Sequence, residues 1–283
     1  MKLTLMAGAG NSFALWDARA LGEPRDAAEV ARELCERTWP GASATLDGLL
    51  VVSPGTDGAA CRMTIFNADG SRPEACGNGL RCVARFAREQ GFSAADAFKV
   101  QTDAGVRSVE MVREGGAITA VRASMGPPRS IEVGVTLASS KGSHRATLVD
   151  MGNPHAVLFV ADERTAPVAE LGRELERHPR FPKRTNVEFA ALRDGRVHLR
   201  VWERGVGETA ACGTGACATA VAALREGKLV LPVDIELPGG TLRVDWDGAG
   251  EVLLTGPCEV LWAGEVNLER RNVLGTTQKG AKA

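Results

Sequence analysis

Two stretches of this 283-residue chain can be laid over each other without a gap. The first reads Asn67-Ala68-Asp69-Gly70-Ser71-Arg72-Pro73-Glu74-Ala75-Cys76-Gly77-Asn78-Gly79. The second reads Glu203-Arg204-Gly205-Val206-Gly207-Glu208-Thr209-Ala210-Ala211-Cys212-Gly213-Thr214-Gly215. Each follows a short run typical of a strand and precedes a helical pattern that ends at a glycine, Gly91 or Gly227. Self-similarity at a fixed spacing indicates two copies of one structural unit.

Other landmarks recur in the same order. Gly10-Asn11 corresponds to Gly152-Asn153, Gly105 to Gly240, and 125–127 to 255–257. Because several matches in one order are hard to attribute to chance, the sequence predicts an α+β protein with two pseudo-symmetric lobes, each combining strands with one principal helix.

We expect an N-terminal lobe at 1–125 that carries Cys76, a C-terminal lobe at 126–262 that carries Cys212, and a frayed tail at 276–283. Amphipathic patterns predict two additional helices, at 27–38 and 163–178.

Composition places the chain among globular proteins. Hydrophobic residues make up 44% and charged residues 24%, with a mean hydropathy of −0.08, which excludes disorder as the main class. The net charge of −1 gives no general attraction to nucleic acid or to an anionic membrane. No run approaches the ~18 apolar residues of a membrane helix, and the N-terminal apolar run is too short for a signal peptide. We therefore expect a cytoplasmic protein.

Seven cysteines, an odd number in a chain without an export signal, predict free thiols in a reducing compartment. Two of them, Cys76 and Cys212, stand in the same Cys-Gly-x-Gly pattern at the start of a helix in each repeat. A helix start exposes unpaired N–H groups and a partial positive charge of about half a unit, which lowers the pKa of a thiol. The glycines allow the same N–H groups to bind a carboxylate.

Two equivalent thiols suit the inversion of an α-carbon. A base must remove the hydrogen on one face, and an acid must return a proton on the other. N–H groups aimed at the adjacent carboxylate would stabilise the carbanion that develops between these steps.

Packing and zinc binding are the simpler explanations of cysteine. Packing suits the five other cysteines, which are Cys35, Cys61, Cys82, Cys217 and Cys258. It does not explain two matching, glycine-flanked positions at Cys76 and Cys212. We expect no metal, because the cysteine spacings lack the short pairs of zinc ribbons and no histidine cluster accompanies them.

Further motifs surround the two cysteines. They include Met6-Ala7-Gly8-Ala9-Gly10-Asn11-Ser12-Phe13, Met151-Gly152-Asn153-Pro154-His155 and Thr185-Asn186-Val187. With these residues the sequence resembles diaminopimelate epimerase, a cofactor-independent amino-acid epimerase of the two-cysteine racemase group, from Met6 to about Val273. The resemblance implies a strongly curved, mostly antiparallel sheet around a central helix in each lobe, with a segment of about 263–275 returning to the first. It also implies a homodimer, a small-molecule substrate and no cofactor.

The resemblance assigns the chemistry to the two cysteines. Cys76 and Cys212 would be the acid–base pair that interconverts LL- and meso-2,6-diaminopimelate, a precursor of lysine and of peptidoglycan. The residues that would bind the reacting carboxylate through their N–H groups are Gly77, Asn78, Gly213 and Thr214.

The resemblance also implies residues around the rest of the substrate. His155 and Glu203 would contact the substrate amine and tune the pKa of the cysteines. The remaining substrate-binding positions are Asn11, Asn67, Asn153, Asn186 and Arg204. The chain departs from the family pattern at Gly48, where glutamine is common, and at Ser12, where aspartate is frequent.

Two alternatives stay open. The first is a cofactor-independent racemase of another amino acid, of the histidine or proline type, although Arg204 with the asparagines favours a substrate with a second amino-acid head group. The second is a non-enzymatic carboxylate-binding or redox protein that uses the same helix ends. A Rossmann-type dehydrogenase is excluded, because the glycine pattern at 8–13 lacks its third glycine.

Overall fold

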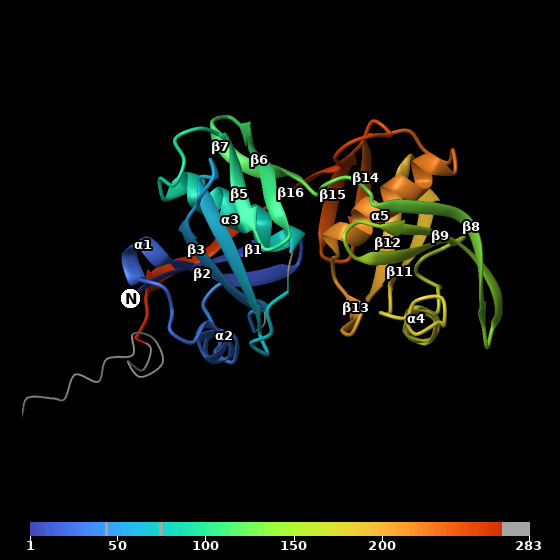
Figure 1. The fold of residues 1–283 in the computed structure, drawn as a ribbon, viewed down its shortest axis with the longest axis horizontal. Coiled ribbons are helices and arrows are strands. Elements are labelled where there is room, and N and C mark those ends of the chain that lie inside the picture. The colour runs from blue at the N-terminus through green and yellow to red at the C-terminus, as the bar shows by residue number, and fades with distance from the viewer. Residues whose placement is uncertain (43–44, 74–75, 268–283) are drawn as a thin grey trace, which may run out of the picture. The chain divides into compact units, whose positions relative to one another are not determined.

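The chain divides into two units in a computed structural model that describes residues 1–42, 45–73 and 76–267 (Figure 1). Unit 1 comprises Met1–Val121 together with Cys258–Ala283, and unit 2 comprises Arg122–Pro257. The boundaries between the units lie after Val121 and after Pro257, a few residues before the expected boundaries after residues 125 and 262. The chain returns to unit 1 early because the strand that begins at Glu259 already pairs there. The expected tail at 276–283, and 268–275 of the expected returning segment, lie outside the described residues.

Unit 1 contains strands on either side of three helical segments. In chain order its elements are β1 (Lys2–Gly8), β2 (Asn11–Asp17), α1 (Ala18–Leu21), α2 (Ala27–Cys35), β3 (Gly48–Pro54), β4 (Cys61–Asn67), α3 (Gly77–Glu89), β5 (Ala97–Thr102), β6 (Gly105–Glu114), β7 (Ala117–Ser124), which crosses the division, and β17 (Glu259–Glu265). The strands pair in the order β17-β1-β2-β3-β4-β5-β6. The pairs β2–β3 and β4–β5 are parallel and the others antiparallel.

Unit 2 repeats this plan. Its elements are β8 (Ser130–Ser139), β9 (Gly142–Asp150), β10 (Pro154–Phe159), α4 (Val168–Glu176), β11 (Asn186–Arg193), β12 (Arg196–Glu203), β13 (Gly207–Thr209), α5 (Gly213–Arg225), β14 (Val233–Leu237), β15 (Gly240–Asp245) and β16 (Leu253–Gly256). The order β8-β9-β10-β11-β12-β14-β15 has the same succession of antiparallel and parallel pairs as unit 1. The C-terminal β17 therefore fills in unit 1 the place that β8 fills in unit 2, and the duplication predicted from the sequence is confirmed.

The strand register gives residue-by-residue equivalences between the units. In the parallel pair β2–β3, Phe13 pairs with Gly48, and in β10–β11, His155 pairs with Asn186. Two residues further along, β3 carries Leu50 and β11 carries Glu188. Leu50 and Glu188 are thus equivalent, as are Phe13 and His155.

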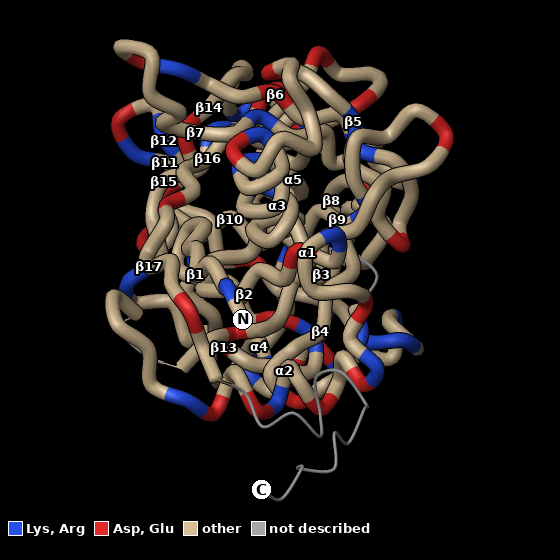
Figure 2. The backbone as a smooth tube through the Cα atoms, turned by 90° about the vertical axis from the view of Figure 1, so that its left-hand side faces the viewer, with Lys and Arg blue, Asp and Glu red and all other residues tan. Residues whose placement is uncertain are grey.

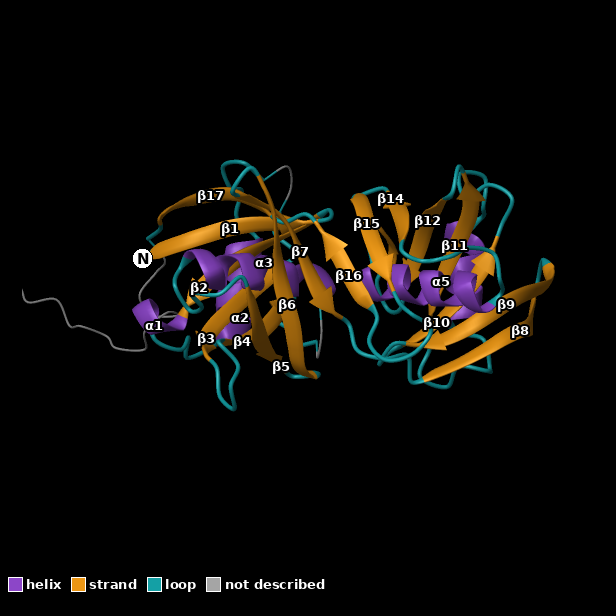
Figure 3. Cartoon of the chain, turned by 90° about the horizontal axis from the view of Figure 1, so that it is seen from above, coloured by secondary structure: helices purple, strands orange, loops and turns teal. Residues whose placement is uncertain are grey.

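The sheet of each unit curves around one central helix (Figure 3). The helix α3 contacts β1, β2, β3, β4 and β6, and α5 contacts β8 to β11 and β14 to β16. In α5 every residue from Ala216 to Ala223 is buried, as expected of a helix that strands surround. The predicted α+β class, with a mostly antiparallel sheet about a central helix, is confirmed.

A second helix packs on the outer face of each sheet. In unit 1, Val30, Ala31 and Leu34 of α2 pack against strand residues that include Leu49 and Val51. In unit 2, α4 packs against Val187 and Phe189 among others. Because successive side chains of a strand point to opposite faces, Leu50 and Glu188 point the other way, toward α3 and α5.

Both outer helices are shorter than the sequence predicts. The helix α2 ends at Cys35 rather than 38. The helix α4 covers Val168–Glu176 rather than 163–178, because Pro167 stands at its N-cap and a residue before proline avoids the helical conformation.

Acidic and basic residues are interspersed along the backbone, in agreement with the balanced composition (Figure 2). Within the described part of the chain, no helix has the length and apolar character needed to cross a membrane.

Candidate active site at two equivalent helix starts

Cys76 and Cys212 hold the same position at the start of α3 and α5. Each is the N-cap residue and has an extended backbone, with φ −149° and ψ 110° for Cys76 and φ −129° and ψ 110° for Cys212. Cys76 Sγ accepts a hydrogen bond from the N–H of Gly79 over 3.3 Å, and Cys212 Sγ accepts one from Gly215 over 3.4 Å. Each sulfur therefore takes the place of the usual capping oxygen. The predicted placement of both thiols at helix N-termini is confirmed.

Glycine three residues after each cysteine leaves room for a side chain from the sheet. A Cβ at residue 79 would stand 3.0 Å from Leu50 Cδ2 and 3.5 Å from Cys76 Sγ. A Cβ at residue 215 would stand 2.9 Å from Glu188 Oε1 and 3.3 Å from Cys212 Sγ. The first turn of the helix thus rests on an aliphatic side chain in unit 1 and on a carboxyl group in unit 2.

In unit 1, polar contacts hold Asn78, the second residue of α3. Its Nδ2 donates to Oδ1 of Asn11, at the start of β2, over 2.6 Å. The fully buried Arg81 donates from Nη2 to Asn78 Oδ1 over 2.8 Å and from Nη1 to the carbonyl of Gly77 over 3.2 Å. The structure therefore brings Asn11, Gly77 and Asn78 together beside Cys76.

Asn67 ends β4 and lies opposite Gly48 of β3. Its Nδ2 donates to Ser71 Oγ over 2.9 Å, within the turn that follows the strand. A Cβ at residue 48 would stand 2.4 Å from the carbonyl oxygen of Phe66, so this backbone path accommodates glycine and no larger residue.

In unit 2, Asn153 is the residue that corresponds to Asn11, and it contacts Thr214. Asn153 Nδ2 donates to Thr214 Oγ1 over 3.2 Å, and Thr214 Oγ1 lies 3.6 Å from Cys212 Sγ. On its other side, Asn153 Oδ1 lies 3.0 Å from Nε2 of His155.

His155 and Glu188 form a buried pair. Both side chains are fully buried, and His155 Nδ1 lies 2.6 Å from Glu188 Oε1. Burial raises the pKa of Glu188 by more than the neighbouring His155 lowers it. The second carboxyl oxygen, Oε2, has no hydrogen-bond partner among the described residues. A buried polar atom of this kind is rare enough to call for a functional explanation.

Glu203 ends β12 and is a second carboxyl group near Cys212. Its Oε1 accepts a hydrogen bond from Thr209 Oγ1 over 2.6 Å. Burial raises the pKa of Glu203, and hydrogen bonds from Thr209 and Cys212 oppose this effect.

The thiol of Cys212 does not have the lowered pKa that a helix start leads one to expect. Burial raises its pKa well above the ordinary value, and the charges of Glu203 and Glu188 raise it further. Hydrogen bonds from Thr214 and from the N–H of Gly215 act in the opposite direction but are outweighed. The expectation is wrong for Cys212, because desolvation and two carboxyl groups exceed the effect of the helix terminus.

Asn186 joins two segments of unit 2. Its Oδ1 accepts a hydrogen bond from the backbone N–H of Arg204 over 2.9 Å, and its Nδ2 donates to the carbonyl of Pro154 over 2.9 Å. Asn186 thereby ties the turn after Glu203 to the strand that carries His155. The side chain of Arg204 is exposed, with Nη1 3.5 Å from the carbonyl oxygen of Lys183.

Arg81, Glu188 and Thr209 are not among the residues predicted from the sequence. A signal was present for two of them. Glu188 interrupts the apolar run Val187–Leu192, and Arg81 stands between two apolar residues, Leu80 and Cys82, near the start of α3. A charged residue within such a run is costly to bury unless it has a polar partner.

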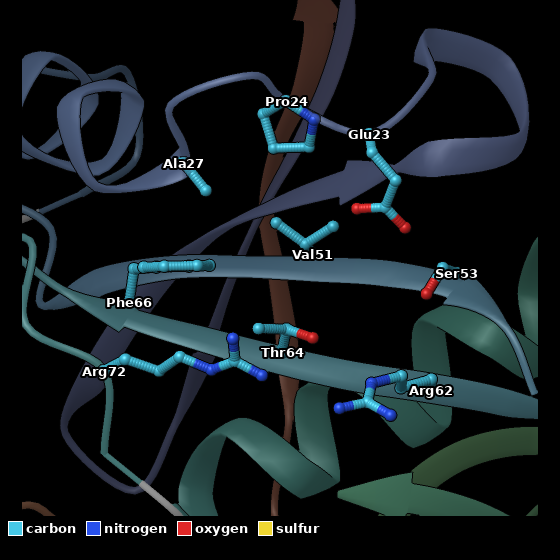
Figure 4. A pocket seen from close by; sticks show the side chains of 9 residues that line it. All are labelled: Glu23, Pro24, Ala27, Val51, Ser53, Arg62, Thr64, Phe66 and Arg72. Carbon is cyan, nitrogen blue, oxygen red and sulfur yellow. The ribbon is translucent and has the colours of Figure 1, made fainter. Parts of the chain in front are cut away.

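A pocket of about 280 Å³ lies on unit 1 away from this site (Figure 4). It is lined by Val51, Thr64 and Phe66 among others, on the face of β3 and β4 opposite to Leu50 and α3. Arg62 and Arg72 at its edge both donate to Asp103. The pocket therefore does not coincide with the surroundings of Cys76.

Comparisons with known proteins show the family of this chain. The model of the family described as diaminopimelate epimerase matches residues 3–131 and 147–261. A diaminopimelate epimerase from Moorella thermoacetica is 41% identical over 283 residues, covering 95% of this chain and 100% of the relative. Another, from Desulforudis audaxviator, is 43% identical over 279 residues, covering 94% and 99%.

Solved structures share the fold at lower identity. A phenazine biosynthesis protein of the PhzF family from Bacillus anthracis has a TM-score of 0.71 at 16% identity, covering 95% of this chain and 99% of that chain. A hydroxyproline epimerase from Agrobacterium vitis has a TM-score of 0.67 at 18% identity, covering 93% and 91%. These likenesses concern the fold alone. The family match and the full-length relatives go further, and they show that this chain belongs to the diaminopimelate epimerase family.

Proposed function

We propose that this chain interconverts LL- and meso-2,6-diaminopimelate by proton transfer between the substrate α-carbon and two cysteines, Cys76 and Cys212. Membership of the family makes the chain an amino-acid epimerase, an isomerase of lysine biosynthesis. The observation that carries the cysteine assignment is the equivalence of two N-cap sulfurs in two units of the same topology. Packing alone gives no reason for that equivalence.

The proposed reaction conserves protons at every step. One cysteine, as thiolate, takes the α-hydrogen as a proton and leaves the C–H electron pair on carbon. The thiol of the other cysteine delivers its own proton to the opposite face. The configuration is then inverted and the cysteines have exchanged protonation states, so the reverse reaction uses the same two groups. A raised thiol pKa suits this task, because a thiolate with a high pKa is a stronger base toward a weakly acidic C–H bond.

Backbone N–H groups at the helix starts would stabilise the carbanion. The first bond inside α3 runs from Leu80 N–H to the carbonyl of Cys76, and the first inside α5 runs from Ala216 N–H to that of Cys212, each over 2.9 Å. The N–H groups of Gly77, Asn78, Gly213 and Thr214 precede these bonds, where a helix start presents donors to an anion. Binding the α-carboxylate there places the donors where negative charge develops.

The remaining predicted residues would bind the other parts of the substrate. Asn11 and Asn153 are held at the two helix starts by their contacts with Asn78 and Thr214. The exposed guanidinium of Arg204 could form a bidentate pair with the distal carboxylate. The other residues in these roles are Asn67, His155, Asn186 and Glu203.

Hydrogen exchange tests the reaction. We expect the purified protein, without added pyridoxal phosphate or metal, to incorporate deuterium from D₂O at the α-carbon of LL-diaminopimelate. Cys76→Ala and Cys212→Ala should each abolish net epimerisation, because either change removes the proton donor on one face. Substantial epimerisation by either variant would rule out the two-cysteine scheme.

A racemase of another amino acid, of the histidine or proline type, is the second candidate on the same scaffold. The same exchange assay with histidine and proline separates the two: exchange there, and none with diaminopimelate, would move the assignment. The full-length relatives named diaminopimelate epimerase favour the first candidate.

The resemblance further supports a homodimer in the cytoplasm, with no cofactor, no nucleic acid and no membrane as partner. Light scattering after size-exclusion chromatography tests the dimer, because one chain has a mass of 29.8 kDa. A mass equal to that value across the working concentration range would refute it.

A further inference from the structure

A line of polar contacts joins the sulfur of Cys212 to a carboxyl group in the core of unit 2. Thr214 Oγ1 lies 3.6 Å from Cys212 Sγ and accepts a hydrogen bond from Asn153 Nδ2 over 3.2 Å. Asn153 Oδ1 lies 3.0 Å from His155 Nε2, and His155 Nδ1 lies 2.6 Å from Glu188 Oε1. The line runs from the first turn of α5 to β11, and its last two side chains are fully buried.

From His155 to Cys212, each hydrogen bond along this line can be donated toward the sulfur of Cys212. With the amide of Asn153 in the orientation that the structure has, its Oδ1 can only accept, so His155 Nε2 carries a hydrogen. The hydrogen between His155 Nδ1 and Glu188 Oε1 then joins these two side chains at the end of the line. Thr214 accepts from Asn153, so its own hydroxyl hydrogen is available to the sulfur of Cys212.

Unit 1 lacks this arrangement. The equivalents of His155 and Glu188 are Phe13 and Leu50, and neither has a polar side chain. Unit 1 keeps a hydrogen bond between Asn11 and Asn78, the equivalents of Asn153 and Thr214. Its direction is reversed, because Asn78 donates to Asn11, whereas in unit 2 Asn153 donates to Thr214. A line that ends on a buried carboxyl group is therefore a property of the Cys212 site.

We propose that Glu188 is a positioning residue for Cys212: it holds His155 so that the line of hydrogen bonds points the hydroxyl hydrogen of Thr214 at the sulfur. The inference rests on the proposed function, in which Cys212 alternates between thiol and thiolate. It concerns the thiolate, which gains most from a directed O–H donor because a hydrogen bond to a charged acceptor is the stronger kind.

The other groups around Cys212 show why such a donor is needed. Glu203 on β12 accepts a hydrogen bond from the thiol and favours the protonated sulfur, as burial does. On the neighbouring strands, His155 on β10 pairs with Glu188 on β11, and the charge of Glu188 also favours the protonated sulfur. The hydroxyl of Thr214 and the N–H of Gly215 are the donors that favour the thiolate.

Alkylation of Cys212 by iodoacetamide, followed by mass spectrometry between pH 6.5 and 10, measures its thiolate without requiring turnover. We expect Glu188→Leu to slow this alkylation roughly ten- to a hundredfold relative to Glu188→Gln at a given pH, the loss typical of a hydrogen bond to a charged acceptor. Glu188→Gln is the matched reference, because both variants remove the charge that raises the Cys212 pKa, while the glutamine amide N–H can still donate to His155 Nδ1 and leave the direction of the line intact. Alkylation of Cys76 in the same sample is the internal control.

If Glu188 served only packing, the effects of the two variants on Cys212 alkylation would rank the other way. Leucine fills the same place in unit 1, as Leu50, so a packing role would tolerate Glu188→Leu and penalise the buried amide of Glu188→Gln. That order, or equal alkylation of Cys212 in Glu188→Leu and Glu188→Gln, would overturn the proposal.

Variants at the other end of the line test the proposal even if Glu188→Leu fails to fold. Thr214→Val should slow Cys212 alkylation, and Thr214→Ser, which keeps the hydroxyl, should restore it. Adding Glu188→Leu to Thr214→Val should cause little further loss, since both act through one hydroxyl. Full additivity, or no effect of Thr214→Val, would refute the inference. Activity that survives Cys212→Ala would refute the proposed function instead, and would leave these alkylation results as they are.

Discussion

Arg81 donates a hydrogen bond from Nη2 to Asn78 Oδ1 over 2.8 Å, at a place where the arginine side chain is fully buried. Its Nη1 bonds the carbonyl of Gly77, so one guanidinium holds two consecutive residues of the first turn of α3. The equivalent residue in α5 is Cys217, which is buried but carries no charge. The two helix starts are alike in backbone and different in the side chains that hold them.

Replacing Arg81 tests the importance of this support. We expect Arg81→Met to lower kcat/KM for diaminopimelate at least about tenfold, because loss of the partner of a buried polar group typically costs ~1–3 kcal/mol and here leaves Asn78 without a fixed orientation. Arg81→Lys is the matched control, since it keeps the charge but not the two-point geometry, and it should fall between. Steady-state kinetics with circular dichroism as a folding check would measure both. A folded Arg81→Met protein with full kcat/KM would contradict the prediction.

The duplication offers a matched pair of glycine variants. Gly79→Ala places a Cβ 3.0 Å from Leu50 Cδ2, the end of a flexible side chain that can move aside. Gly215→Ala places a Cβ 2.9 Å from Glu188 Oε1, which a short contact with His155 holds in place. We expect Gly215→Ala to lower the melting temperature and to slow epimerisation by more than Gly79→Ala does. Equal losses in the two variants would show that the carboxyl group moves as freely as the leucine.

Glu176 on α4 supports the turn that carries Arg204. This buried carboxylate accepts hydrogen bonds from Trp202 Nε1 over 2.9 Å and from the N–H of Gly205 over 2.8 Å, and Arg184 lies 3.5 Å away. Burial raises its pKa, but these donors outweigh burial, so the pKa lies below its ordinary value.

The sign of the pH effect at Glu176 follows from that direction. A carboxyl group with a lowered pKa stabilises the folded state above its unfolded pKa of 4.5, and the contribution is lost as the pH falls below that value. We expect Glu176→Gln to destabilise the protein by ~1–2 kcal/mol at pH 7 and by less below pH 4, as urea denaturation would show. KM should rise more than kcat falls if Arg204 binds substrate. The same loss at pH 7 and at pH 4 would count against this account.

Buried thiols should make the protein less stable in alkali. Burial raises the pKa of Cys61 from 9.0 to about 12 and that of Cys258 to about 11. A thiol with a raised pKa stays protonated in the folded state while the unfolded chain ionises, so its contribution to stability is lost as the pH rises above 9. The loss is ~1.4 kcal/mol per pH unit for each thiol. Urea denaturation between pH 8 and 10.5 should show this slope, and Cys61→Ala should reduce it. An unchanged slope in that variant would exclude Cys61 as a contributor.

Much of the site could be predicted from the sequence because its signals are local. A cysteine followed by Gly-x-Gly, before an apolar helical pattern, has the spacing of an N-cap, and the structure has both helices starting there. The polar partners are harder to foresee, because Arg81 and Glu188 are recognised only by where they are buried. The start of α4 follows from a local signal as well, because Pro167 stands at its N-cap.

The sequence by itself determined the duplication, the α+β class and the two cysteines at helix starts. Each of these depends on residues close together in the chain, whose spacing sets backbone conformation directly. Only the tertiary structure decided which side chains of the sheet lie close to each sulfur. His155, Glu188 and Glu203 come from three different strands and meet near Cys212 through sheet pairing, whereas the same pairing brings Leu50 beneath α3. The pKa of a thiol depends on burial and on charges at such distances, and for that reason the shift at Cys212 has the opposite sign to the one its local sequence predicts.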